Sequence, residues 1–285
     1  MHYYLKLMRP KHWIKNLLIL LPLFFGSAIF DYSLLGRIFL AFISFCLISS
    51  AIYVINDIRD LEQDKKNPTK KNRPIASGKV SVKNAIVLAV ILMVLSIFIN
   101  VIINANIYAW AAFLLYFFIN IGYSFGLKNI PILDVAILTS GFFIRVLYGS
   151  QICGIEISHW LYLTVLSMSF FLGLGKRRNE IDRSDKKTRK VLASYNYQFL
   201  DKNMYLCAAL TVVFYSLWCV DPIIIQRIGQ NIIWTVPLIL IILMKYSLNV
   251  EETADGDPVE TLLNDKVLLG LVLVFVVALA GIIYL

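Results

Sequence analysis

Charged residues are scarce in this chain of 285 residues. Asp, Glu, Lys and Arg together make up 16% of it, whereas hydrophobic residues make up 59% and the mean hydropathy is +0.73. This composition excludes an ordinary soluble domain, because soluble domains carry about 25% charged residues. It also argues against binding to nucleic acid, since the basic residues lie in loops between apolar segments. We therefore expect an integral membrane protein.

Cysteine is equally scarce. The four cysteines are Cys46, Cys153, Cys207 and Cys219, and no two of them form a Cys-x-x-Cys pair. Three of the four lie within apolar segments of helix length. Neither a disulfide framework nor a zinc site is therefore expected.

Nine apolar blocks follow one another along the chain. Each is about long enough to cross a hydrocarbon core of roughly 30 Å. The first resembles a signal peptide, but eight more blocks follow it, so we interpret it as a transmembrane helix. The predicted fold class is all-α: a polytopic membrane protein with nine transmembrane helices, one domain over residues 1–285 and a polar cavity at its cytosolic side. The expected spans are residues 14–30, 37–55, 84–103, 107–123, 133–152, 160–175, 205–220, 232–246 and 267–285.

Basic residues are distributed unequally between alternate loops. With the N-terminus in the cytosol, all but three of the 27 Lys and Arg residues fall in cytosolic segments. The exceptions are Arg37 and Arg227 on the outer side and Arg145 within a span. This asymmetry follows the positive-inside rule and predicts an outer C-terminus. It also predicts two long, charged cytosolic loops, at 56–83 and 176–204.

The first of these loops opens with four acids directly after an apolar helix, in Asn56-Asp57-Ile58-Arg59-Asp60-Leu61-Glu62-Gln63-Asp64. On a helix turning about 100° per residue, Asp57, Asp60 and Asp64 fall within roughly 60° of one another. Carboxylates placed so closely repel unless a cation lies between them. Mg²⁺ carrying a diphosphate fits, because Mg²⁺ binds one or two carboxylates together with waters and phosphate oxygens. The alternative, acids that are simply solvated, is disfavoured at the membrane face.

Basic side chains near both charged loops are candidates for binding phosphate. Arg73 follows Lys70 in a proline-bounded loop, and an arginine can bind phosphate through two parallel hydrogen bonds. Lys176 and Arg177 leave the sixth predicted span, and Glu180, one turn later, is a candidate for a further metal ligand. The alternative is the general positive charge of cytosolic loops.

Lys15 and Asn16 lie one turn inside the first predicted span, and Arg145 lies in the middle of another. A bound phosphate would compensate the charge of Lys15, and snorkelling of the ammonium group to the interface is the alternative. Arg145 is either part of a functional site or half of a structural ion pair. The sequence leaves both questions open.

The pattern Asn56-Asp57-x-x-Asp60-x-x-x-Asp64 resembles the first aspartate motif of the UbiA superfamily of intramembrane transferases. The second, aspartate-rich motif of its prenyltransferases is replaced here by Lys176-Arg177-x-x-Glu180. Other stretches resemble the decaprenyl-phosphate phosphoribosyltransferase branch, and the resemblance covers nearly the whole chain. They include Arg9-Pro10-Lys11-x-Trp13-x-Lys15-Asn16, Arg73-Pro74-Ile75-Ala76-x-Gly78, Tyr123-Ser124-x-Gly126-Leu127-Lys128 and Gly141-Phe142-x-Ile144-Arg145.

This resemblance implies a transferase of the bacterial plasma membrane whose active site faces the cytoplasm. It would move phosphoribose from phosphoribosyl pyrophosphate to a polyprenyl phosphate and release pyrophosphate. The implied Mg²⁺ ligands are Asn56, Asp57, Asp60 and Asp64, and the implied catalytic residues are Asp57, Asp60 and Glu180. The donor phosphates would be bound by Lys70, Arg73, Lys128, Lys176 and Arg177, and the acceptor phosphate or the 5-phosphate by Lys15, Asn16 and Arg145.

Two other functions stay open. A prenyltransferase of the same fold would place a prenyl diphosphate on the same metal, but the single acid of the second motif favours a more anionic donor. A transporter would carry polar residues distributed through its spans, whereas these spans hold little charge besides Arg145. Neither the polyprenyl chain length nor the oligomeric state follows from the sequence, and a homo-oligomer is open.

Overall fold

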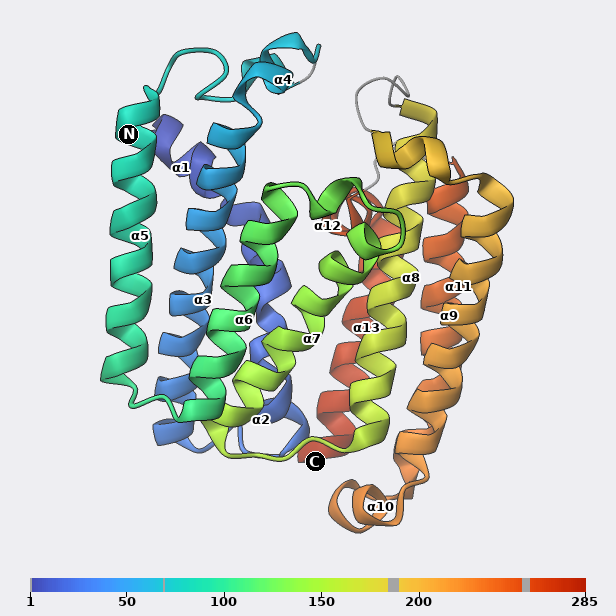
Figure 1. The fold of residues 1–285 in the computed structure, drawn as a ribbon. Helices are drawn as coiled ribbons and strands as arrows, with labels where there is room; N and C mark the ends of the chain where they lie inside the picture. Colours follow the sequence, from blue (N-terminus) through green and yellow to red (C-terminus); the bar gives the residue numbers. More distant parts are fainter. Residues whose placement is uncertain (1, 69, 184–189, 253–256) are drawn as a thin grey trace. The chain divides into compact units, whose positions relative to one another are not determined.

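Residues 2–68, 70–183, 190–252 and 257–285 are described by the computed structural model, and within these ranges every regular element is a helix (Figure 1). The predicted all-α class is confirmed. The predicted loops 56–83 and 176–204 lie only partly within the described residues. The chain divides into two compact units, Met1–Lys128 with Ile144–Glu156 and Asn129–Phe143 with Ile157–Leu285. A single domain over the whole chain stays a prediction.

The first unit is built around α3 (Tyr32–Arg59). The helices α5 (Val82–Ile102) and α6 (Ile107–Ser124) run beside α3, and the 3₁₀ helix η1 (Pro10–Leu20) also packs on it (Figure 1). The shorter elements are α1 (His2–Met8), α2 (Leu21–Phe25), α4 (Leu61–Lys66), η2 (Lys70–Asn72) and η3 (Leu127–Asn129). The helix α7 (Leu133–Cys153) contributes its second half to this unit and its first half to the other.

Side-chain caps fix where the long helices of this unit begin. Asp31 accepts hydrogen bonds from the backbone N–H groups of Ser33 and Leu34, at 3.0 and 3.2 Å, and so satisfies donors at the start of α3. The Ser33 hydroxyl also donates to Asp31, at 2.8 Å, and together with the Leu34 N–H it holds the pKa of the Asp31 carboxyl below its usual value. Asn106 caps α6 in the same way, at 2.8 Å from the Ala109 nitrogen.

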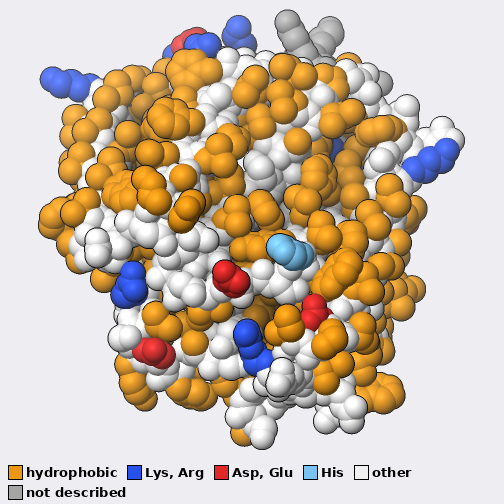
Figure 2. All heavy atoms as spheres, turned by 60° about the horizontal axis from the view of Figure 1, so that its bottom comes forward, with side chains coloured by type: hydrophobic (Ala, Val, Ile, Leu, Met, Phe, Trp, Pro, Cys, Tyr) orange, Lys and Arg blue, Asp and Glu red, His pale blue; other side chains and the backbone are white. Residues whose placement is uncertain are grey.

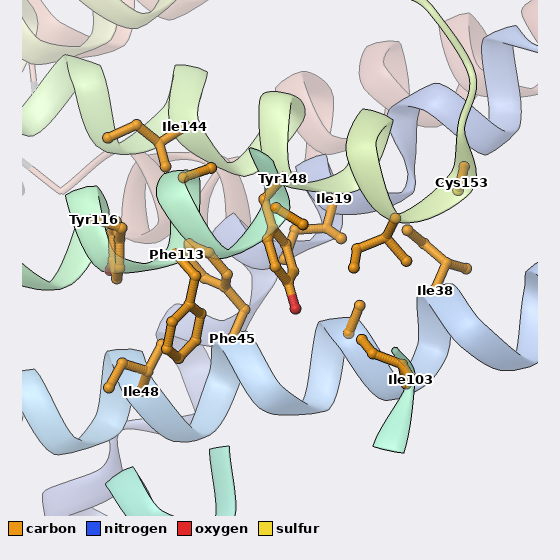
Figure 3. Packing of buried hydrophobic residues seen from close by; sticks show 14 of the residues in the cluster. Ile19, Ile38, Phe45, Ile48, Ile103, Phe113, Tyr116, Ile144, Tyr148 and Cys153 are labelled. Atoms are coloured by element: carbon orange, nitrogen blue, oxygen red, sulfur yellow. The ribbon is translucent and has the colours of Figure 1, made fainter. Parts of the chain in front are cut away.

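Aromatic side chains from three helices fill the core of the first unit (Figure 3). The Phe45 ring lies 4.5 Å from that of Tyr116, 5.2 Å from that of Tyr148 and 6.3 Å from that of Phe113, measured between ring centroids. Such contacts add to the burial of apolar surface. They fix α3 against α6 and α7.

The second unit consists of long helices that pack along one another. Helix α11 (Val236–Glu252) packs on α8 (His159–Arg183), on α9 (Tyr197–Cys219) and on α13 (Lys266–Tyr284) (Figure 1). The shorter elements are η4 (Lys190–Ser194), α10 (Pro222–Ile228), η5 (Gln230–Thr235) and α12 (Pro258–Asn264).

Six helical segments of the described residues are long and apolar enough to cross a membrane, or seven if the bent pair of α9 and α10 is one span. The six are Tyr32–Arg59, Val82–Ile102, Ile107–Ser124, Leu133–Cys153, Gln230–Glu251 and Lys266–Tyr284. The two other predicted spans, 14–30 and 160–175, fall on helical segments that are not among them. The chain is thus a multi-pass membrane protein, and nine spans stay a prediction.

Apolar side chains are exposed in large numbers. Along α5, Ile86, Val90, Val94 and Phe98 are each at least half exposed. Hydrophobic side chains also cover most of the face shown in Figure 2, where charged side chains are few and scattered. Exposed apolar surface of this extent is unusual for a soluble protein and is expected where a helix contacts lipid.

Candidate active site

Asp57 is a buried carboxylate in the last turn of α3. The residue is only 3% exposed. Its Oδ1 accepts a hydrogen bond from Arg9 Nη2 at 2.5 Å and another from Arg73 Nη1 at 2.9 Å. A buried charge needs such partners, because taking an unpaired carboxylate out of water is costly. Two guanidinium groups therefore meet at one carboxylate oxygen.

Asp64 joins the same cluster through Arg73. The Nη1 atom of Arg73 also donates to Asp64 Oδ2, at 2.7 Å, and so links Asp64 to Asp57. Asp64 is 3% exposed although it lies in the short helix α4. The two acids and the two arginines form a compact group of opposite charges, which we call the acid cluster: Asp57, Asp64, Arg9 and Arg73.

Asp60 has a different cationic partner. Its Oδ1 accepts a hydrogen bond from Lys128 Nζ at 2.6 Å. The predicted stripe of aspartates relied on helical geometry, whereas α3 ends at Arg59 and α4 begins at Leu61. Asp60 forms the turn between them, with φ −89° and ψ 6°. Short polar side chains favour helix ends over helix interiors, which accounts for a break at this residue.

The loop that carries Arg73 is held at both ends. Asn67 Oδ1 accepts a hydrogen bond from the Lys70 backbone nitrogen at 3.1 Å, and the Lys70 carbonyl accepts one from the Arg73 nitrogen at 2.9 Å. Beyond Arg73, Ile75 and Val80 are buried in an apolar cluster of the same unit. Arg73 thereby reaches the acids, whereas the Lys70 side chain is exposed.

Arg9 has an unusual backbone conformation. It lies between α1 and η1 with φ 52° and ψ 60°, in the left-handed region. Its guanidinium carbon lies 4.9 Å from the centroid of the Tyr53 ring, so the side chain stacks on α3 while it reaches Asp57. Arg9 stands in one of the stretches that resemble the family, but no role was predicted for it. A basic residue directly before a proline at the membrane edge was the available signal.

Arg145 and Asn16 are brought together deeper in the first unit. Arg145 Nε donates to Asn16 Oδ1 at 2.7 Å, and Nη2 donates to the Tyr116 hydroxyl at 3.0 Å. The guanidinium carbon lies 5.3 Å from the Phe45 ring centroid and 4.8 Å from that of Tyr116. Lys15, next to Asn16 in η1, is half-buried. Arg145 therefore takes part in an amide, hydroxyl and aromatic cluster.

The deeper cluster contacts α3 at positions before Asp57. Asn16 Nδ2 contacts Cys46 Sγ at 3.1 Å, and the Tyr116 hydroxyl lies 3.2 Å from Ser49 Oγ. At a rise of about 1.5 Å per residue, these α3 positions lie about 12–17 Å from Asp57 along the helix. Arg145 is consequently two to three helical turns away from the acids.

Arg177 is fully enclosed by acids of the second unit. Its side chain is 0% exposed, with Nε at 2.6 Å from Asp134 Oδ2 and Nη1 at 2.5 Å from Glu180 Oε2. The Tyr195 hydroxyl donates to the other oxygen of Asp134 at 2.6 Å and accepts from the Ile132 nitrogen at the same distance. Burial and the bond to Asp134 raise the pKa of Tyr195 to about 12, so the hydroxyl keeps its proton at neutral pH.

Lys176 lies beside this buried network but is more open. Its side chain is 28% exposed, and its Nζ is 3.6 Å from Asp257 Oδ2. The neighbouring Arg178 contacts Asp201 at 2.5 Å. Of the basic residues predicted at the end of this helix, Lys176 is thus the one with solvent access, and Arg177 is engaged with acids within its own unit.

The pattern of the UbiA prenyltransferase family matches residues 19–264. The chain belongs to this family. Its relatives include proteins named decaprenyl-phosphate phosphoribosyltransferase. The one from Corynebacterium glutamicum is 37% identical over 98% of this chain and 86% of its own length. The one from Mycolicibacterium smegmatis is 36% identical over 98% of this chain and 92% of its own length.

Solved UbiA structures share the fold. A UbiA homologue from Archaeoglobus fulgidus bound to GPP and Mg²⁺ matches with a TM-score of 0.73 at 19% identity, over 99% of this chain and all of that one. The same archaeal homologue bound to DMAPP and Mg²⁺ also gives a TM-score of 0.73, at 20% identity, over 98% of this chain and 99% of that one.

Oxygen atoms of the kind that Mg²⁺ binds are grouped near the end of α3. Asp57 and Asp64 converge on one arginine nitrogen, and Asn56 Oδ1 is buried with no hydrogen-bond partner among the described residues. Mg²⁺ needs only one or two carboxylates when waters and phosphate oxygens complete its shell. In the part of the chain that the structure describes, no three His, Cys, Asp or Glu side chains are grouped as a ready metal site.

The predicted site residues therefore divide into groups. The first unit joins Asp57, Asp64 and Arg73, pairs Asp60 with Lys128, and places Asn16 with Arg145. The second unit joins Arg177 with Glu180. The participation of Glu180 in the metal site of Asp57 stays a prediction, as do the other assigned roles. Arg9, Tyr53 and Asp134 had no assigned role, because their importance depends on partners far away in the sequence.

Proposed function

We propose that this UbiA protein transfers 5-phosphoribose from phosphoribosyl pyrophosphate to a polyprenyl phosphate and releases pyrophosphate. The observation that carries the proposal is the acid cluster, in which two buried carboxylates and two guanidinium groups meet at the end of α3. Such a group can bind a metal through its acids and phosphate through its arginines. The relatives named decaprenyl-phosphate phosphoribosyltransferase support this choice of reaction.

The acids at the end of α3 are the proposed metal ligands. We assign Mg²⁺ to Asp57 and Asp64, with Asn56 and Asp60 as neighbouring oxygen donors. When bound, Mg²⁺ would neutralise the negative charge that develops on the leaving pyrophosphate. The burial of both carboxylates strengthens their electrostatic interactions, because little water screens them.

The basic residues of the first unit are the proposed donor site. Arg73 and Arg9 can bind phosphate oxygens in pairs, and Lys128 can add a third cation beside Asp60. Lys70 has an exposed side chain from which to reach the donor. Contact of Lys176, a residue of the second unit, with the donor phosphates stays a prediction. We assign Arg177 and Glu180 a positioning role, since Arg177 is fully buried between Glu180 and Asp134.

The reaction needs no strong general base. The acceptor phosphate is already ionised, so one of its oxygens forms a bond to C1 of the ribose while the bond from C1 to pyrophosphate breaks. The bonding electron pair leaves with the pyrophosphate. We propose in-line displacement with inversion at C1, in which the chain acts by positioning and by charge stabilisation. Finding retention at C1 would contradict this mechanism.

The proposed topology brings soluble donor and lipid acceptor together. We propose nine spans. Two of them, formed by η1 with α2 and by α8, would be fitted to the membrane by polar residues near their ends. The N-terminus and the acid cluster would then face the cytosol of a bacterial cell, where phosphoribosyl pyrophosphate is dissolved. The acceptor phosphate would lie at the same membrane face.

Transfer of label tests the proposed function directly. Purified protein in lipid nanodiscs is incubated with Mg²⁺, polyprenyl phosphate and phosphoribosyl pyrophosphate labelled in the ribose. The proposal predicts label in the lipid phase and an equal amount of released pyrophosphate. Chelation of Mg²⁺ should stop both. Hydrolysis of the donor without labelled lipid would overturn the proposal.

A further inference from the structure

Arg9 combines three features that together indicate more than a structural ion pair. Its backbone is left-handed, although it precedes Pro10, and a proline restricts the residue before it to extended conformations. Glycine would adopt a left-handed conformation without strain. The presence of arginine in place of glycine at this position must therefore be explained by its side chain. That side chain stacks on Tyr53 and donates to Asp57.

The charges of the acid cluster balance among its own four side chains. Asp57 and Asp64 supply two negative charges, and Arg9 and Arg73 supply two positive ones. Both acids are almost fully buried, whereas the arginine side chains keep 21% and 25% exposure. The carboxylates are thus fixed in the protein, and the guanidinium groups have room to move towards solvent.

We propose that Arg9 and Arg73 form a guanidinium latch, which occupies the metal-binding carboxylates and opens when a diphosphate draws the guanidinium groups onto its own oxygens. Metal and diphosphate then enter the site together. This inference rests on the proposed function in one respect, namely that the site takes a diphosphate.

The charge balance explains why each ligand alone should bind weakly. Mg²⁺ alone would have to displace the guanidinium groups and would leave an excess of positive charge in a site with little water. A diphosphate alone would withdraw the arginines and leave two buried carboxylates unpaired, which is costly. With both ligands, the metal pairs with the carboxylates and the arginines pair with phosphate. The two binding events should therefore strengthen each other by the same factor.

Binding of Mn²⁺, used as a probe for Mg²⁺, tests the latch without any turnover. The full chain in nanodiscs is dialysed against Mn²⁺ with and without pyrophosphate, and protein-bound Mn²⁺ is compared at equal free Mn²⁺. The latch predicts half-saturation at a free Mn²⁺ concentration lower by at least about tenfold when pyrophosphate is present. Equal affinity in both conditions would overturn the proposal with the unaltered protein alone.

Two substitutions separate the latch from a general field of positive charge. Arg9→Gln should strengthen the binding of Mn²⁺ alone by about fivefold or more and should reduce the enhancement by pyrophosphate. Arg59→Gln is the matched control, because Arg59 is at the end of the same helix but stacks on Phe125, 5.3 Å from the ring centroid. It should leave both quantities near those of the unaltered protein. Equal effects of the two substitutions would contradict the latch.

The outcome for the latch can be told apart from the outcome for the proposed function. If phosphoribose is transferred but Arg9→Gln leaves the enhancement by pyrophosphate unchanged, the latch is wrong and the function stands. If pyrophosphate strengthens Mn²⁺ binding through Arg9 but no phosphoribose reaches lipid, the latch stands and the donor is another diphosphate. Should Arg9→Gln fail to fold, Arg9→Lys takes its place, and the same loss of enhancement is expected because lysine lacks the paired N–H groups.

Discussion

Asp57 is the residue on which the proposed chemistry depends most. It is buried, and it is the carboxylate at which both arginines of the acid cluster meet. A buried carboxylate attracts a metal ion strongly, because little water screens its charge. An amide of the same shape would keep the packing and lose that charge.

Asp57→Asn is therefore expected to lower the rate of transfer by about 10²–10³-fold, the range found when a charge-stabilising group is removed from an active site. Glu62→Gln provides the control, since Glu62 is exposed in α4 and pairs with Lys65 at 2.8 Å. It should retain the full rate. Comparable rates for Asp57→Asn and the unaltered protein would remove Asp57 from the metal site.

Arg145 has a different role from Asp57, and its contacts indicate which. It donates to Asn16 and Tyr116 and stacks on Phe45, two to three turns from the acids. Replacing it leaves an amide oxygen and a hydroxyl without their donor. Arg145→Gln should thus lower the free energy of unfolding by about 1–3 kcal/mol, read from thermal unfolding in detergent.

Arg37→Gln is the control for Arg145, because Arg37 is exposed and should change the stability by no more than about 0.5 kcal/mol. If Arg145 instead binds phosphate, as the sequence predicts, Arg145→Gln should leave the stability unchanged and raise the KM for donor or acceptor. That second result would show that the deeper cluster belongs to the active site.

At the scale of elements, η1 illustrates what sequence patterns miss. Hydropathy predicted one helix over residues 14–30, but the segment forms the 3₁₀ helix η1 and then the short α2. Pro22 offers a physical reason, because it has no N–H group to donate to the carbonyl four residues before it, that of Leu18. That carbonyl accepts from the Leu21 nitrogen instead.

Gly149 lets η1 approach α7 within the first unit. A Cβ atom on Gly149 would lie 2.1 Å from the Ile19 carbonyl oxygen, and the contact is with backbone that cannot rotate away. Gly149→Ala is expected to lower the free energy of unfolding by about 2–3 kcal/mol through overpacking. In Gly36→Ala the new Cβ meets nothing within 4 Å, so that variant should be no less stable. Equal thermal stability of both variants would contradict this packing.

Most helices and the acidic part of the site could be predicted, and the pairings between distant residues could not. Apolar blocks and capping residues such as Asp31 and Asn106 locate helices from local sequence. The position of Asp57 directly after an apolar run is likewise local information. Arg177 shows the limit: its partner Asp134 is 43 residues away in the chain, and no local pattern distinguishes an arginine held by acids from one that binds phosphate.

At the scale of the whole molecule, the basic residues predict an orientation. All but three of the 27 Lys and Arg residues lie in the segments assigned to the cytosol. A periplasmic reporter fused after Leu285 should therefore be active in bacterial cells, and the same reporter at the N-terminus should be inactive. Activity at both ends, or at neither, would require an even number of spans and would contradict the predicted nine.

The choice of donor tests the central claim most directly. One preparation in nanodiscs is given labelled phosphoribosyl pyrophosphate with polyprenyl phosphate and, in parallel, a labelled prenyl diphosphate with an aromatic acid, each with Mg²⁺. The proposed function predicts that the first pair gives polyprenyl phosphate carrying labelled phosphoribose and that the second pair gives no labelled product. Label transferred only from the prenyl diphosphate would contradict it and would identify the protein as a prenyltransferase.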